Sequence, residues 1–333
     1  PARVDPGSAP LQVFTLTESM KTEIAEAQDP VVMPKACKNP AEIAGMRAAH
    51  LLDGAAVSEL LCWLDAQALM LDGAPLTEID VTKKLEELRR ARGILDISFD
   101  TILGAGPHGA IMHYRVTEQT DRRILPGDIV LVDSGAQYDN GTTDITRTLP
   151  MGGNYDPGVR RPYTRVLQGL IAISRVTFPR GVAGAHLDAL ARAPLWSEGM
   201  DYNHGTGHGV GAGLSVHEGP VRIARISDIP LRPGMILSNE PGYYREGAFG
   251  IRLENLIVVR EVESGDGRDM LGFETLTLAP LDRRLIEPGL LSREEIAWLD
   301  AYHARVWDEI APLVGNEVRD WLFLATRPLG AAA

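Results

Sequence analysis

The sequence contains few cysteines and no long apolar run. Its two cysteines, Cys37 and Cys62, match no metal-ligand spacing. We therefore expect no disulfide framework, two small apolar side chains at these positions, and a reducing, cytoplasmic location. No apolar run reaches the roughly 18 residues that a membrane-spanning helix requires, and no basic-then-apolar segment resembles a secretory signal, so no membrane association is expected.

Basic residues are outnumbered by acidic ones. The chain has 33 lysines and arginines against 45 aspartates and glutamates, a formal net charge of −12, and its pI is about 5.2. A protein that binds a nucleic-acid duplex normally presents a basic surface, so this balance argues against nucleic acid as a partner. The hydrophobic content of 44% and the charged content of 23% are ordinary for a globular protein.

The periodic segments follow one another as helices, strands, helices, strands and a final helix. Helical spacing of apolar residues and cap signals predict helices over residues 40–67, 78–90, 159–176, 184–198 and from Ser292 onwards. Runs rich in β-branched residues and broken by turn signals predict strands within residues 97–106, 128–152, 234–241 and 249–259. This order favours a mixed α+β fold over a regular alternation of strand and helix.

Two aspartates flank a hairpin signal. Asp139-Asn140-Gly141 lies between Asp133 and Asp144, slightly beyond the midpoint of the pair. We therefore expect the two aspartates to be close neighbours across paired strands, although not necessarily directly opposite each other. Neighbouring acids on a sheet repel unless a cation lies between them. Taken alone, the pair fits two solvated strand-end aspartates better than a cation site.

Two glutamates repeat the pattern. Glu240 and Glu254 lie at the ends of apolar strand segments, and the midpoint between them is Gly247, a residue suited to a turn. Arg252 precedes Glu254 by two residues and shares its strand face, where a guanidinium can pin a carboxylate and lower its pKa. Either glutamate alone fits an ordinary edge charge, but unpaired charges within apolar runs are costly. Together, two hairpins would supply four acids.

Three of the eight histidines lie in the glycine-rich stretch HGTGHGVGAGLSVH. The alternating glycines disfavour a helix, and in an extended chain His204, Thr206 and His208 would share one face. We expect His208 to be a metal ligand, and His204 and His217 to lie beside the metal and donate to a substrate. The glycines are expected to leave room for a substrate backbone. A polar loop without a site is the plainer alternative.

The other histidines divide into one candidate and four structural residues. His113 lies between an apolar and a polar stretch, which fits a loop at the entry of the same pocket, although a lone histidine there is more often a surface residue. Nothing in the sequence groups the remaining four with the acids: His50, His108, His186 and His303. Four carboxylates and one imidazole suffice for two divalent cations if some carboxylates bridge. Such ligation favours manganese, cobalt, iron or zinc over calcium and magnesium.

These residues together resemble the metallopeptidase family with the pita-bread fold, which includes methionine aminopeptidase, prolidase and aminopeptidase P. The resemblance rests on Asp133 and Asp144 in LVDSGAQYDNGTTDITRT, His208 in HGTGHGVG, Glu240 in LSNEPGYY and Glu254 in GIRLEN. Their order is that of the family's five metal ligands. The segments HGTGHGVGAGLSVHEGP and FETLTLAPLDRRLI are most similar to aminopeptidase P of the cytosolic, three-domain kind.

The resemblance implies a fold and a division of the chain. Residues 34–285 would form an α+β pita-bread catalytic domain, and residues 286–333 a C-terminal helical extension. Residues 1–33 would be a tail or the remnant of a missing N-terminal domain. The family pattern also implies two divalent metal ions, with Mn²⁺ preferred and Zn²⁺ or Co²⁺ as alternatives, and a homodimer.

The resemblance also implies an activity. The protein would be an Xaa-Pro aminopeptidase that hydrolyses the bond between a first residue and a following proline, using a hydroxide shared by two metal ions. Glu240 would be both ligand and proton shuttle, and His113, His204 and His217 would face the substrate. A prolidase restricted to Xaa-Pro dipeptides is the alternative enzyme. A non-catalytic peptide-binding scaffold would be expected to lack ligands, and none of the five is missing here.

Overall fold

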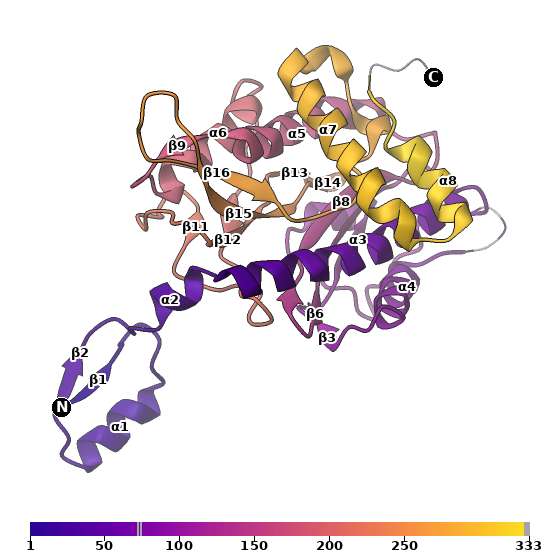
Figure 1. The fold of residues 1–333 in the computed structure, drawn as a ribbon. Helices are drawn as coiled ribbons and strands as arrows, with labels where there is room; N and C mark the ends of the chain where they lie inside the picture. Colours follow the sequence, from indigo (N-terminus) through magenta and orange to yellow (C-terminus); the bar gives the residue numbers. More distant parts are fainter. Residues whose placement is uncertain (72, 74, 330–333) are drawn as a thin grey trace.

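The computed structural model describes residues 1–71, 73 and 75–329 of the chain. Two groups of helices lie on either side of a set of short sheets, so the fold is of the mixed α+β type that the order of elements predicts (Figure 1). The helices are α3 (Pro40–Ala68) and α4 (Glu78–Arg90) in one group, and α5 (Arg160–Arg175) and α6 (Gly184–Trp196) in the other. Apolar side chains of each group pack against the neighbouring strands and form the core.

The helices begin where their sequence signals indicate. The helices α3, α4 and α7 (Arg293–Ile310) start directly after Asn39, Thr77 and Ser292, and each of these residues forms a capping box. Their side-chain oxygens accept hydrogen bonds from the first backbone N–H groups of the helix, which would otherwise lack partners. The predicted helices α5 and α6 are confirmed as well.

The first sheet carries the predicted aspartate hairpin. Its strands lie in the order β4 (Ile102–Ala105), β5 (Ile129–Ser134) and β8 (Ile145–Pro150); β6 (Ala136–Tyr138) and β7 (Gly141–Thr142) extend the hairpin, and β3 (Asp96–Ile97) pairs with β6. In this register Asp133 lies opposite Thr146, while Asp144 stands two residues before Thr146. The aspartates are therefore close neighbours without being directly opposite, as the position of the turn predicts.

The second sheet leads into the predicted glutamate hairpin. Its strands lie in the order β12 (Ile236–Asn239), β15 (Asn255–Val262), β16 (Met270–Thr275) and β9 (Phe178–Pro179), and β13 (Gly242–Arg245) pairs with β14 (Phe249–Arg252). Asn239 pairs with Asn255 and Gly242 with Arg252, so one register runs through both halves of the hairpin. The turn falls at Gly247, whose φ is +72°, a value that glycine adopts without strain. The predicted midpoint is confirmed.

The C-terminal part is helical, as expected. The helices α7 and α8 (Asn316–Ala325) lie beside α3 (Figure 1). Leu299, Val306 and Ile310 of α7 are buried in the same core as α5. Short 3-10 helices lie at Gly106–Ala110, Pro157–Val159, Arg283–Leu285, Pro288–Leu290 and Ala311–Leu313.

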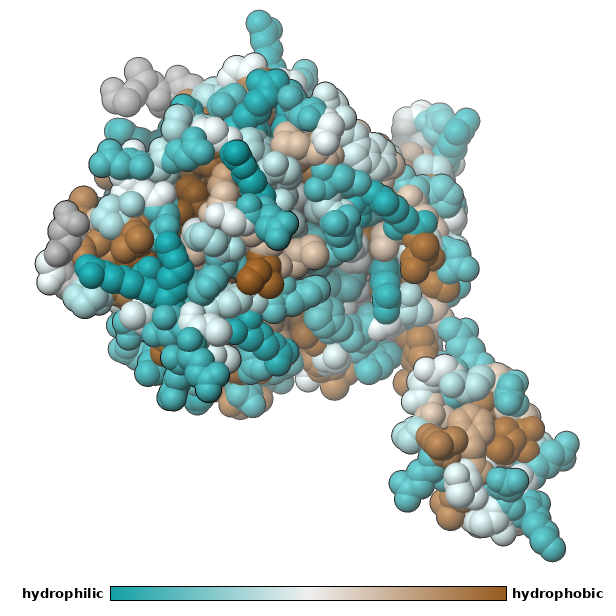
Figure 2. Space-filling model, turned by 180° about the vertical axis from the view of Figure 1, so that it is seen from behind, coloured by the Kyte–Doolittle hydropathy of each residue, from teal (hydrophilic) through white to brown (hydrophobic). Residues whose placement is uncertain are grey.

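The N-terminal segment contains regular structure. Strand β1 (Ala2–Val4) pairs in parallel with β2 (Ile24–Glu26) across α1 (Leu11–Ser19), and the short α2 (Val32–Ala36) leads to α3. This unit projects from the main body in Figure 1, and Figure 2 shows apolar residues among the polar ones on it. Leu11 is 80% exposed and Met20 66% exposed. The division of the chain at residues 33 and 285 remains a prediction.

The described part of the chain has no helix with both the length and the apolarity needed to cross a membrane. Cys37 and Cys62 are free thiols in this structure. Cys62 is buried on α3. Cys37 lies just ahead of that helix, and its backbone forms an isolated antiparallel β-bridge with Met235.

His303 provides a test of how the C-terminal extension is packed. Its Nε2 accepts a hydrogen bond from the backbone N–H of Leu281 at 3.1 Å, and burial lowers the pKa of His303 to about 3. Because the unfolded chain binds a proton that the folded chain does not, the free energy of unfolding falls as the pH drops below about 6.5. Between pH 7 and pH 5 this one residue should account for about 2 kcal/mol.

Urea unfolding of the wild type and of His303→Gln at pH 7 and pH 5 measures this contribution. Glutamine keeps an acceptor but cannot titrate, so the difference between the two pH values should shrink by about 2 kcal/mol. An equal pH dependence in both proteins would contradict the buried, neutral state of His303.

Candidate active site

A cavity of about 680 Å³ lies where the two hairpins meet the glycine-rich stretch. Every residue predicted for the site lines this cavity: His113, Asp133, Asp144, His204, His208, His217, Glu240, Arg252 and Glu254. The four histidines expected to be structural do not line it. The sequence pattern therefore selects one place in the fold, although its residues come from four separate segments: the loop of His113, the two hairpins and the glycine-rich stretch.

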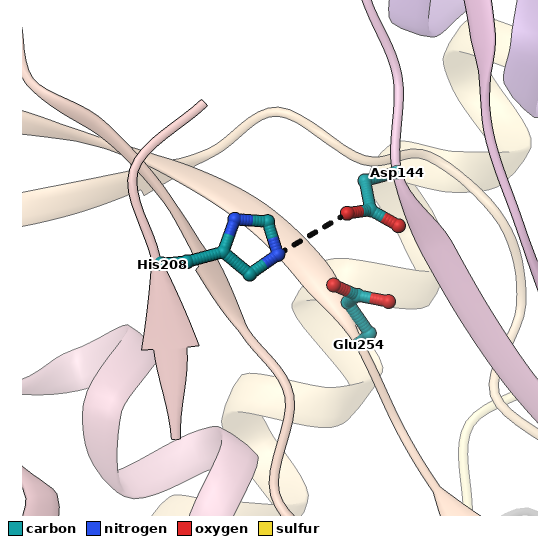
Figure 3. Close-up of side chains that lie close together, drawn as sticks. All are labelled: Asp144, His208 and Glu254. Atoms are coloured by element: carbon teal, nitrogen blue, oxygen red, sulfur yellow. Dashed lines mark ion pairs between the residues drawn. The ribbon is translucent and has the colours of Figure 1, made fainter. Parts of the chain in front are cut away.

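The centre of the site is a group of three potential ligands (Figure 3). One ligand atom from each of Asp144, His208 and Glu254 lies within 4.8 Å of the others. His208 Nε2 is 3.4 Å from Asp144 Oδ2 and 3.5 Å from Glu240 Oε1. The imidazole from β10 (Gly207–His208) thus points between acids supplied by both hairpins.

The tautomer of His208 follows from its other nitrogen. Nδ1 lies 3.0 Å from the carbonyl oxygen of Gly209, and a carbonyl can only accept, so Nδ1 carries the proton. In the neutral ring Nε2 then holds a lone pair that faces two carboxylate oxygens. Proteins usually orient a metal-binding histidine in this way: the ring nitrogen that does not bind the metal donates a hydrogen bond to a backbone carbonyl or a carboxylate.

Arg252 pins a different carboxylate from the one its spacing suggests. The guanidinium donates from Nη2 to Asp133 Oδ2 at 2.5 Å, across the interface between the hairpins. It also donates from Nη1 to the Tyr244 hydroxyl at 2.6 Å and from Nε to Thr146 Oγ1 at 3.3 Å. Arg252 therefore holds the two hairpins together, whereas Glu254, on its own strand, accepts from the Thr146 hydroxyl at 2.7 Å.

Three of the four acids of the site resist ionisation in the absence of a cation. Burial, followed by the charges of Asp133 and Glu240, raises the pKa of Asp144. Burial and the charge of Asp144 raise the pKa of Glu254, and burial raises the pKa of Glu240. Several carboxylates in a small, dry volume destabilise one another's charged forms.

A divalent cation fits this donor set. Asp133 Oδ1 is buried and has no hydrogen-bond partner among the residues that the structure describes. This oxygen, the lone pair of His208 Nε2 and the crowded acids together need more positive charge than the Arg252 guanidinium supplies. Four carboxylates and one imidazole, without a thiolate, match manganese, iron, cobalt or catalytic zinc better than structural zinc.

The candidate substrate-facing histidines are not equivalent. His204 donates from Nδ1 to the Gly205 carbonyl oxygen at 2.7 Å. Its Nε2 lies 2.9 Å from the Tyr244 hydroxyl oxygen. Because that hydroxyl accepts from Arg252, its own proton can be donated to His204 Nε2. Both nitrogens of His204 are therefore engaged by the protein in this conformation, and donation from His204 to a substrate stays a prediction.

His113 and His217 have free rings within the described chain. Both are exposed and line the cavity, and the rings of His208 and His217 lie 4.1 Å apart. Burial, followed by the charge of His208, lowers the pKa of His217, so this imidazole is neutral near pH 7. Of the three candidate histidines, these two are available to a ligand.

The glycine-rich stretch departs from the predicted extended strand. Only Gly207 and His208 form a strand, β10, paired with β11 (Arg222–Ile223). Because the chain bends at residues 203–204, Thr206 does not share the cavity face with His204 and His208. Its buried hydroxyl donates instead to Asp188 at 2.7 Å.

Two of the glycines give clearance to the protein itself. A Cβ at Gly207 would lie 2.0 Å from the Ser238 carbonyl oxygen, and one at Gly209 would lie 2.1 Å from the Glu218 carbonyl oxygen. The expected clearance for a substrate is therefore wrong for these two positions. All three glycines line the cavity, but a Cβ at Gly205 would make only ordinary contacts.

The two kinds of glycine can be told apart by substitution. Gly207→Ala should lower the free energy of unfolding by about 1–3 kcal/mol, because the methyl group must displace the Ser238 backbone. It should also reduce metal content, since the backbone N–H of His208 donates to Ser238 Oγ and that hydroxyl donates to Glu240. Gly205→Ala, whose nearest contact would be 3.4 Å, is the matched control and should change neither quantity. Equal effects of both variants on unfolding and metal content would contradict this assignment.

Several supporting residues were missed by the sequence reasoning. Tyr244, Thr146 and Ser238 each donate to a predicted site residue. Thr146 follows Asp144 by two residues, and Ser238 precedes Glu240 by two, so the period of a strand could have indicated both. Glu218 forms a buried ion pair with Lys38 at 2.9 Å, a partner 180 residues away that no local pattern indicates.

Comparison with known proteins agrees with this geometry. Residues 44–261 match the model of metallopeptidase family M24, and residues 269–329 match the C-terminal region of peptidase M24. The chain belongs to the metallopeptidase family M24, and the predicted α+β pita-bread fold is confirmed.

Individual relatives narrow the similarity. The chain is 48% identical to aminopeptidase P2 of Arabidopsis thaliana over 311 residues, which cover 91% of this chain and 43% of that protein. It is 46% identical to a probable Xaa-Pro aminopeptidase P of Aspergillus fumigatus over 326 residues, which cover 95% of this chain and 49% of that protein. The chain thus spans about half the length of the curated relatives it matches.

Solved structures show the same pattern. An X-prolyl aminopeptidase from Caenorhabditis elegans, described as a cytosolic enzyme with a di-nuclear active site, has a TM-score of 0.87 and 36% identity, covering 95% of this chain and 56% of that one. An Xaa-Pro dipeptidase from Bacillus anthracis has a TM-score of 0.71 and 28% identity, covering 84% of this chain and 73% of that one.

Proposed function

We propose that this protein is a metal-dependent aminopeptidase that removes a first residue from peptides with proline in second position. The observation that carries the proposal is the convergence of four carboxylates and His208 on one cavity, where the buried Asp133 Oδ1 has no hydrogen-bond partner within the described part of the chain. The names of the relatives, and the di-nuclear site stated for the Caenorhabditis elegans enzyme, support this choice of activity.

Five residues would hold two divalent cations: Asp133, Asp144, His208, Glu240 and Glu254. Bound there, the cations would supply Lewis acidity that lowers the pKa of a water molecule and polarises the peptide carbonyl. Manganese is the proposed metal, with zinc or cobalt as alternatives. Arg252 would keep Asp133 oriented through the hydrogen bond that it already makes.

Glu240 is the proposed proton carrier. Its carboxylate lines the cavity and accepts a hydrogen bond from Ser238 Oγ at 3.0 Å, which fixes one oxygen. As the water oxygen bonds to the carbonyl carbon of the first residue, Glu240 would accept the water proton. It would then return that proton to the proline nitrogen as the carbon–nitrogen bond breaks, because a tertiary amide nitrogen must be protonated in order to leave.

The two free histidines would contact the substrate. His113 and His217 line the cavity with free rings, and either could donate to the oxygen that gains negative charge during attack. His204 is assigned a supporting role, since it anchors Tyr244 and through it Arg252. These roles, a homodimeric state, a cytoplasmic location and the boundaries at residues 33 and 285 are all proposals.

Peptide length separates this proposal from the alternative of a prolidase. Protein purified with Mn²⁺ should release the first residue from an Xaa-Pro-Pro tripeptide, and EDTA should abolish the reaction. Cleavage of Xaa-Pro dipeptides alone would favour a prolidase, and no cleavage of either by metal-loaded protein would favour a binding scaffold. Metal content after dialysis, measured by mass spectrometry with Mn²⁺, Zn²⁺ and Co²⁺ in competition, tests the identity of the cation.

A further inference from the structure

One buried carboxylate outside the cavity, that of Glu78, has no role in the chemistry above. Glu78 is the first residue of α4 and is fully buried. Its Oε1 accepts from the backbone N–H of Ala105 at 2.8 Å, and its Oε2 accepts from the Tyr114 hydroxyl at 3.1 Å and from the backbone N–H of Arg122 at 3.2 Å. His108 Nδ1 lies 2.9 Å from Oε2. Burying a carboxylate is costly unless its hydrogen bonds are satisfied, as they are here.

All of these partners belong to one segment of chain. Residues 105–122 run from the end of β4, through the 3-10 helix at Gly106–Ala110, to the loop that carries His113. Glu78 contacts this segment near its beginning, in its middle and at its end. A single side chain from α4 thus fixes the path of the whole loop.

His113 depends on its neighbours for its position. Its own side chain makes no hydrogen bond within the described residues, and it is exposed towards the cavity. The residues on either side are held instead. The Met112 carbonyl accepts from Arg252 Nη1 at 3.3 Å, and the Tyr114 hydroxyl donates to Glu78. The imidazole therefore lies between one anchor that belongs to the site and one that belongs to α4.

We propose that Glu78 is a positioning residue, which holds His113 in place for the substrate through Tyr114. The proposal rests on the proposed function, because that function gives His113 its role. A residue displaced by about 1 Å can cost up to a hundredfold in rate even when the change lies away from the reacting atoms. None of the five proposed metal ligands lies within residues 105–122, so loosening this loop should leave metal binding intact.

The side-chain chemistry defines the variants. In Glu78→Gln one oxygen remains to accept from Ala105, but an amide NH₂ then faces the N–H of Arg122 and the hydroxyl of Tyr114. Tyr114→Phe removes the hydroxyl that links the residue next to His113 to Glu78, together with its contact to the Thr120 carbonyl oxygen at 3.0 Å. This variant remains informative if Glu78→Gln does not fold. Glu87→Gln is the matched control, since Glu87 is an exposed residue of the same helix that pairs only with Lys84 among the described residues.

Two measurements test the proposal on metal-loaded protein. For an Xaa-Pro-Pro peptide, kcat/KM should fall by about tenfold to a hundredfold in Glu78→Gln and Tyr114→Phe, while the metal content of both variants stays that of the wild type. The control Glu87→Gln should match the wild type in metal content and in kinetics. The double variant should be little worse than Glu78→Gln, because both substitutions break one link. In the NMR spectrum of protein loaded with diamagnetic Zn²⁺, the imidazole signal of His113, assigned as the signal missing from His113→Gln, should shift in both variants while the His217 signal stays.

The outcomes separate this proposal from the proposed function. If wild-type protein cleaves no Xaa-Pro peptide but the His113 signal moves as expected, the function fails and the positioning link stands. An unmoved His113 signal in both variants would overturn the link, whatever the activity. A loss of activity that follows loss of metal or of folded protein would show a purely structural role and would also overturn it.

Discussion

Replacing Asp144 by asparagine is expected to abolish metal binding and Xaa-Pro hydrolysis, and to stabilise the metal-free protein. Asp144 is 4% exposed, and its carboxylate faces His208 Nε2 together with Glu254. Asparagine keeps the shape but removes the negative charge that a cation needs. Without a cation the same charge is unfavourable, because burial and then Asp133 and Glu240 raise the pKa of Asp144.

The sign of the pH dependence follows from that direction. An acid whose pKa is raised on folding holds its proton longer in the folded state, so the free energy of unfolding falls as the pH rises above about 3.8, the ordinary value. In EDTA, wild-type protein should therefore lose stability between pH 5 and pH 8, and Asp144→Asn should lose less. With Mn²⁺ present the order should reverse, since only the wild type gains binding energy.

Metal content and thermal unfolding with and without EDTA measure both effects. Asp139→Asn is the matched control, because Asp139 is exposed at the turn of the same hairpin and should change neither metal content nor the midpoint of unfolding. Asp144→Asn protein that retained two metal ions and full activity would show that the acids are not the ligands.

Replacing Arg147 by methionine is expected to cause the largest loss of stability, about 4 kcal/mol. Arg147 is 2% exposed, and no carboxylate pairs with it among the residues described. It donates instead to the carbonyl oxygens of Glu254, Ala279 and Pro280 and lies 3.0 Å from the Tyr302 hydroxyl. Methionine would leave several buried acceptors without donors at once.

The position of Arg147 predicts an effect on the site as well. Its guanidinium joins the backbone of Glu254, a proposed metal ligand, to Tyr302 of α7, so the variant should also bind metal more weakly. Urea unfolding and metal titration measure the two effects, and Arg293→Met, at an exposed position on α7, should be near neutral in both. A change of less than about 1 kcal/mol in Arg147→Met would contradict this account.

The parts of the structure that local sequence determines were predicted well. The capping residues Asn39, Thr77 and Ser292 each begin a helix, because a cap acts within one turn. The turn at Gly247 and the offset of Asp133 from Asp144 follow from strand pairing close in the chain. Since hairpin register depends on nearby residues, four acids could be grouped from spacing alone.

The parts that depend on distant contacts could not be predicted in this way. The partner of Arg252 is Asp133, 119 residues away, whereas spacing pointed to its own strand. The engagement of His204 depends on Tyr244, 40 residues away. Position 207 requires glycine because the Ser238 carbonyl oxygen of another strand leaves no room for a Cβ. Each case needs the packing of whole elements, which no periodicity contains.

The origin of the acids in two separate hairpins has a consequence for folding rates. Thr146 and Glu254 lie 108 residues apart in the chain, and contacts of such separation form only after the entropy of closing a long loop has been lost. The complete ligand set therefore exists only late in folding. A stabilising interaction that is absent from the transition state slows unfolding and leaves the folding rate unchanged. A bound cation would thus prolong the lifetime of the folded state without helping the chain to reach it.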